Sequence, residues 1–136
     1  MSTTSPPAAP PLDRRQLWAG RVLSAFAALG LTGSALGKLT GAPALKEMMG
    51  GKFGFDPGIL PKLGVLELAC VVVYVLPRTS MFGAILLAGY LGGAVVTHVR
   101  VADPFVAPIV IGVVAWLGLW LREPRLRELL PFRRDS

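Results

Sequence analysis

The sequence is poor in charged residues and contains a single cysteine and a single histidine. Charged residues make up 16% of its 136 residues, against about 25% in typical soluble domains. One cysteine, Cys70, allows neither a disulfide nor a CxxC thiol relay within the chain. One histidine without clustered ligands predicts no zinc or haem site.

Sequence motifs of common enzymes are also lacking. We find no glycine-rich phosphate loop, no Rossmann fingerprint and no serine–histidine–acid arrangement. We therefore name no catalytic residue and no metal ligand, and expect no stand-alone enzymatic activity.

What the sequence does contain is four long apolar runs. They cover about residues 17–39, 59–76, 81–101 and 105–121. Each is close to the 17–25 residues that cross a membrane as a helix, and Pro, Gly and Asp fall between them. The sequence predicts an all-α integral membrane protein, a bundle of four transmembrane helices. A short interfacial helix is expected over residues 42–49.

Two tails flank the predicted transmembrane domain of residues 16–122. Residues 1–15 are rich in Pro, Ser, Thr and Ala, which is typical of a disordered tail. Residues 123–136 place leucines among arginines and predict a basic amphipathic cytoplasmic helix. This helix either lies on anionic headgroups or is a solvated helical end.

The distribution of basic residues predicts the topology. One set of span ends carries nine of the 14 Lys and Arg residues, and the other carries five. The positive-inside rule therefore places both termini in the cytoplasm. The same rule accounts for the net charge of +6, so the predicted partner is the lipid bilayer and not nucleic acid.

Glycines at four-residue spacing predict where helices pack. Gly33 and Gly37 lie on the first span, and Gly89 and Gly93 on the third. Small residues let helix backbones approach closely inside a bilayer. We favour contacts within the monomer, and leave contacts between copies in a homo-oligomer open.

A set of polar residues falls on three spans, in the half of the membrane away from the termini. It consists of Lys38, Glu67, Tyr90, Thr97, His98 and Arg100. At 1.5 Å per residue, Glu67 lies about 12 Å below the surface. A carboxylate at this depth must be paired, protonated or facing water.

Two pairings of Glu67 follow from shared depth. We expect an ion pair with Arg100 or a hydrogen bond with His98. In the alternative, Lys38 and Arg100 extend to the outer headgroups and His98 is an interfacial residue without a role. The same residues could form a ligand pocket or a structural clasp.

Several segments resemble the DoxX-like family. These include Ser34-Ala35-Leu36-Gly37-Lys38, Gly64-Val65-Leu66-Glu67-Leu68, and the run GYLGGAVVTHVR of residues 89–100. The resemblance implies a small four-helix protein of the bacterial inner membrane. The family name comes from a subunit associated with a quinone-linked oxidoreductase, and some relatives are associated with oxidative stress.

These observations give three functional hypotheses. The leading one is an accessory or lipophile-binding membrane subunit, with a quinone as a candidate ligand near Glu67, Tyr90, His98 and Arg100. Redox chemistry would then require a partner protein. The second is a small-molecule or proton-coupled transporter or channel, and the third is a structural assembly factor for a membrane complex.

Overall fold

A computed structural model describes residues 11–130, which form helices joined by turns and contain no strand. The helices are α1 (Arg14–Leu39), α2 (Pro43–Glu47), a π-helical turn η1 (Met48–Lys52), a 3₁₀ turn η2 (Pro57–Ile59), α3 (Leu60–Val75), α4 (Ser80–Arg100), α5 (Val106–Arg122) and α6 (Pro124–Leu129). The all-α prediction is confirmed, and α2 with η1 lies where the interfacial helix was expected.

Local sequence explains where the helices begin. Asp13 caps α1, because its carboxylate accepts a hydrogen bond from the backbone N–H of Arg15. Asp56 does the same for η2 through the N–H of Gly58. Proline begins α2 and η2, where its missing N–H costs no hydrogen bond. These residues thus fix where α1, α2 and η2 begin.

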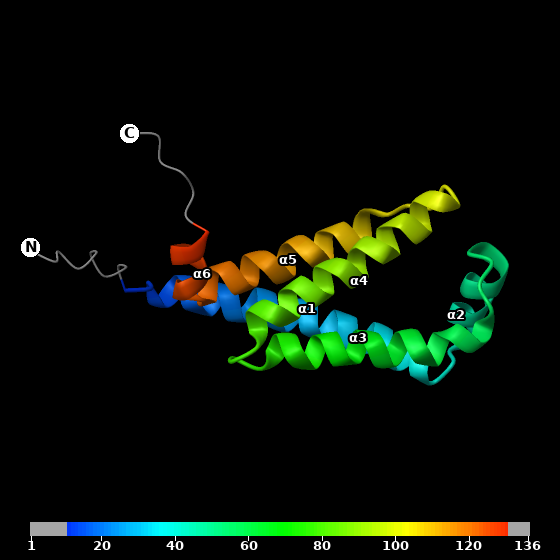
Figure 1. Ribbon diagram of the computed structural model, residues 1–136, viewed down its shortest axis with the longest axis horizontal. Coiled ribbons are helices and arrows are strands. Elements are labelled where there is room, and N and C mark those ends of the chain that lie inside the picture. The colour runs from blue at the N-terminus through cyan, green and yellow to red at the C-terminus, as the bar shows by residue number, and fades with distance from the viewer. Residues whose placement is uncertain (1–10, 131–136) are drawn as a thin grey trace, which may run out of the picture.

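Three helices are long and apolar enough to cross a membrane, namely α1, η2 with α3 (Pro57–Val75), and α4. The fourth, α5, is apolar but has 17 residues, about 25 Å of helix at 1.5 Å per residue. The prediction of four spans is therefore confirmed for three. Because α5 returns the chain to its starting side, α6 lies beside the beginning of α1 (Figure 1).

The four long helices form two pairs that diverge. One pair is α1 with α3 and the other is α4 with α5, and contacts also join the two pairs, between α1 and α5 and between α3 and α4. Figure 1 shows the pairs close together at the end that carries both termini, and spread apart at the opposite end. We call these the terminal end and the connector end. The α1–α3 connector, residues 40–59, lies across the connector end.

Close glycine contacts hold the two pairs together at the terminal end. A Cβ on Gly118 of α5 would lie 2.7 Å from Ser24 Oγ of α1, and one on Gly20 would lie 2.8 Å from the backbone nitrogen of Arg122. A Cβ on Gly83 of α4 would overlap the backbone of Tyr74 in α3. Here backbones approach as closely as small residues permit.

Of the four predicted packing glycines, only Gly37 makes a close contact within the monomer, so the prediction was wrong there for Gly33, Gly89 and Gly93. A Cβ on Gly33, Gly89 or Gly93 would have no atom within 4 Å, and one on Gly37 would contact only Leu45 of α2. The four-residue spacing also occurs where a helix faces open space. Contact of these glycines with a second copy stays a prediction.

Tyr74 joins three helices near the terminal end. Its hydroxyl donates to the carbonyl of Ala115 at 2.7 Å and lies 3.0 Å from Ser24 Oγ. The side chain is fully buried. Gly64, Glu67, Cys70 and Tyr74 are all buried on one face of α3, as their helical spacing predicts.

The tail predictions are tested only in part. Residues 1–10 and 131–136 lie outside the described residues. In α6, Leu126 is buried, while Arg127 stacks over Trp120 and its guanidinium donates to Gln16 Oε1 at 3.2 Å. The described part of the C-terminal segment therefore packs on the bundle.

Candidate functional site

A cavity of about 540 Å³ lies between the two helix pairs, toward the connector end. All four long helices and the connector line it, mostly with apolar side chains. Its polar lining residues are Ser34, Lys38, Glu67, Tyr90, Thr97 and His98. Five of the six residues predicted as a polar cluster thus share one cavity, and Arg100 does not line it.

A three-residue network forms the most polar part of the cavity wall. Lys38 Nζ lies 2.7 Å from Glu67 Oε2, and the two side chains are 9% and 2% exposed. Lys38 also donates to Ser34 Oγ at 2.6 Å, and Ser34 donates to the same carboxylate oxygen at 3.3 Å. Each buried charge therefore has an opposite charge and a hydrogen-bond partner.

The pairing of Glu67 with Arg100 or His98 was wrong. Gly64 explains the difference, because a Cβ there would lie 3.0 Å from the carbonyl oxygen of Ala35 and 3.1 Å from Lys38 Cβ. This close approach of α3 to α1 brings Lys38 to Glu67, one turn further along α3. Lys38 therefore points into the bundle and not to the headgroups.

Sequence analysis did not identify Ser34 as part of the site. The signal was present, because Ser34 and Lys38 are four residues apart and so share a helix face. A buried lysine pairs more favourably when a hydroxyl helps to satisfy its three donors. That argument requires knowing that Lys38 is buried, which the sequence at a span end does not give.

Tyr90 and Thr97 extend the polar wall along α4. Tyr90 is half-buried and close enough to Glu67 to interact with its carboxylate. Thr97 donates its hydroxyl to the carbonyl of Gly93 at 2.9 Å, so this donor is used within its own helix. Among the two, Tyr90 is the better placed to act together with Glu67.

His98 and Arg100 belong to a second group of contacts, at the connector end. His98 Nδ1 lies 2.6 Å from Asp103 Oδ2, and Lys52 of the connector forms an ion pair with Asp103 Oδ1. Arg100 donates to the carbonyl of Phe53, and the Phe53 ring packs edge-on against His98 at 5.0 Å. We call these five residues the latch, because they join the connector to the end of α4.

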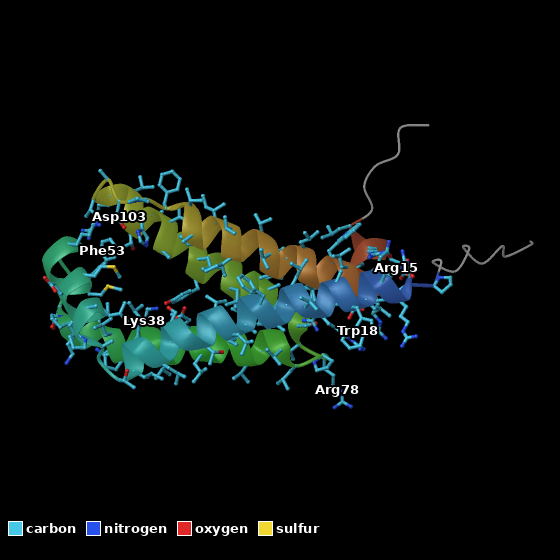
Figure 2. The ribbon with its side chains drawn as sticks, turned by 180° about the vertical axis from the view of Figure 1, so that it is seen from behind. Arg15, Trp18, Lys38, Phe53, Arg78 and Asp103 are labelled. Atoms are coloured by element: carbon cyan, nitrogen blue, oxygen red, sulfur yellow. The ribbon has the colours of Figure 1, made fainter. Side chains whose placement is uncertain are left out.

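Figure 2 shows two latch residues, Phe53 and Asp103, side by side at the end opposite Arg15 and Trp18. Phe53 also belongs to a small apolar cluster with Met49 and Leu60, against which Val101 packs. The latch therefore has a polar rim above an apolar contact. It closes the connector end over the cavity.

Residues 22–119 match the DoxX-like family. The chain belongs to the DoxX-like family. This match covers more than two thirds of the DoxX-like protein and includes every residue of the cavity network and of the latch. The chain matches no curated protein and no solved structure. Family and apolar helices together identify a multi-pass membrane protein.

Within residues 11–130 of this DoxX-like protein, no three His, Cys, Asp or Glu side chains gather where a metal ion could be held. The arrangement instead combines an apolar volume with one buried ion pair. Small-molecule sites typically have 300–1,000 Å³ and a few placed polar groups. The cavity meets both conditions.

Proposed function

We propose that the protein is a lipophile-binding membrane subunit of the bacterial plasma membrane, with both termini in the cytoplasm. The observation that supports this proposal most directly is the mostly apolar cavity of about 540 Å³ with Lys38 and Glu67 in its wall. An apolar body fits the volume, and a polar head would lie against the ion pair. The cavity then occupies the outer half of the bilayer.

The donors in the wall favour a ligand whose head carries an oxygen acceptor. Lys38 has three N–H donors, of which Ser34 and Glu67 take two. The third can donate to a carbonyl or hydroxyl oxygen, with Tyr90 on the facing helix. A quinone has such carbonyls on an apolar body, and it is our candidate ligand in an accessory role to a redox partner.

The experiment is purification in nanodiscs formed directly from the membrane, followed by extraction and mass spectrometry. We expect one lipophile in stoichiometric amount with the wild type. Gly93→Leu, which fills the cavity at an open position, should lose it. Gly33→Leu is the matched control, because Gly33 is equally open but lies outside the cavity.

Loss of the lipophile from both leucine variants, or from neither, would contradict the proposal. Bulk lipid alone in the wild type would favour a structural assembly factor instead. In that case the Lys38–Glu67 pair only fixes packing, and partner proteins should copurify.

A second candidate is proton-coupled transport, which the buried Lys38–Glu67 pair supports. Ionisable residues inside a membrane commonly mark ion and proton pathways. Liposomes containing the protein would then show a proton flux that Glu67→Gln abolishes. Equal flux in wild type, Glu67→Gln and empty liposomes would exclude it.

A further inference from the structure

The side walls of the cavity contain three glycines that leave it open. Gly30 of α1 and Gly89 and Gly93 of α4 line the cavity, and all three are exposed. A Cβ at any of them would meet no atom within 4 Å. They lie between the terminal end, where glycines bring the helix pairs together, and the connector end.

The connector end is closed by contrast. Lys52 contacts Asp103, and Phe53 contacts His98 and Arg100, at the edge of the cavity, where Phe53 and His98 also belong to its lining. Phe53 is 2% exposed and Met49 is 7% exposed, so the connector covers the cavity with buried apolar side chains. The connector thus places apolar side chains between the cavity and the water at this end.

From this contrast we infer that ligands exchange sideways with the lipid bilayer, through openings framed by Gly30, Gly89 and Gly93, while the latch keeps the cavity sealed from the aqueous phase. The inference rests on the proposed function and deepens it. The ligand class becomes a membrane-dissolved lipophile, and water-soluble metabolites are excluded.

The physical reason is the cost of crossing between phases. A lipophile that left through the connector end would expose its apolar surface to water, which is unfavourable in proportion to the area exposed. Through the glycine openings, its apolar body passes directly between cavity and acyl chains. Glycine suits such an opening, because any larger side chain on these helices would narrow it.

The test measures access to the cavity without requiring the ligand. A nitroxide spin label is placed at Gly93→Cys in a Cys70→Ala background in nanodiscs. Its collision rates with oxygen, which dissolves in lipid, and with a nickel chelate, which dissolves in water, are compared by electron paramagnetic resonance. Gly51→Cys on the connector is the water-exposed reference, and Gly33→Cys is the lipid-exposed one.

We expect the Gly93 label to resemble the Gly33 label, with high oxygen and low nickel access. Asp103→Asn breaks two latch contacts and should raise nickel access at Gly93 about fivefold, as expected for an ion pair of partial exposure. It should leave the Gly33 label unchanged. A second label, at Gly89→Cys, repeats the measurement at another position of the cavity wall. It shows whether the label at Gly93 itself blocks the opening.

Nickel access at Gly93 and Gly89 equal to that at Gly51 in the wild type would overturn the inference. So would an Asp103→Asn variant that leaves both cavity labels unchanged. A sealed, lipid-accessible cavity that carries no stoichiometric lipophile would count against the proposed function alone. The two failures are therefore distinguishable.

Discussion

Lys38 and Glu67, 29 residues apart in the chain, form an ion pair of 2.7 Å that is almost fully buried between α1 and α3. Lys38 lies in the last turn of α1, where a lysine can reach the headgroups. It points inward because Gly64 brings the two helices together and Ser34 Oγ accepts a hydrogen bond from its ammonium group. The contacts that hold the ion pair therefore also form part of the cavity wall.

Removing one partner of this pair should cost more than removing both. Lys38→Met leaves a buried carboxylate without its counter-charge, and we expect a loss of about 3–5 kcal/mol in unfolding free energy. Adding Glu67→Gln to Lys38→Met should recover part of that loss. Unfolding in nanodiscs of both single variants, the double variant and the wild type measures the coupling. Additive losses would mean that the two charges do not interact.

Much of the fold could be predicted because it depends on apolar length and helical period. The four apolar runs, the short helix after α1 and the buried face of α3 all follow from local pattern. The polar cluster gathered as expected, since depth along a straight helix is simple arithmetic. Five of its six members line the cavity.

The partners of those residues could not be predicted, because they depend on how helices approach. Gly89 and Gly93 have the four-residue spacing but face open space. Gly83, which does pack closely against Tyr74, has no glycine four residues away. Divergence of α4 from α3 removes Arg100 from Glu67, and the connector supplies Phe53 and Lys52 instead. No periodic signal in the sequence encodes either event.

Glycine substitutions should separate packed positions from open ones. Gly83→Ala forces the backbone of α4 away from Tyr74, and we expect a loss of about 1–3 kcal/mol, as for other overpacked sites. Gly92→Ala adds a Cβ where no atom lies within 4 Å and should change stability little, or raise it by up to about 1 kcal/mol through helix propensity. Thermal unfolding of both variants in the same detergent is the measurement. A loss at Gly92 equal to that at Gly83 would indicate that Gly92 contacts a second copy.

The hydroxyl of Tyr74 should stabilise the junction of α1, α3 and α5. Tyr74→Phe removes a donor to the carbonyl of Ala115 and a contact with Ser24 Oγ. Leaving these buried groups unsatisfied should cost about 1–3 kcal/mol. Tyr90→Phe is a matched control, because Tyr90 lies in the cavity wall and should affect ligand retention more than unfolding. The reverse order of effects would assign the structural role to Tyr90.

The latch should resist acid, because the pKa of Asp103 lies below its ordinary value of 3.8. The cause is first the hydrogen bond from Lys52 and then the hydrogen bond with His98. A carboxyl group with a lowered pKa stabilises the folded contact above its ordinary value, and this contribution is lost as pH falls through the lowered pKa. The connector should therefore stay closed at a pH that already protonates an unpaired aspartate.

Carbon-13 NMR of the Asp103 carboxyl group during an acid titration measures this directly. We expect the midpoint below 3.8 in the wild type and a rise toward that value in Lys52→Gln, which removes the larger cause. Lys62→Gln is the control, since Lys62 is exposed at the start of α3 and does not contact Asp103. A wild-type midpoint at or above the ordinary value would show that Lys52 does not hold the carboxylate. The latch would then depend on Arg100 and Phe53 alone.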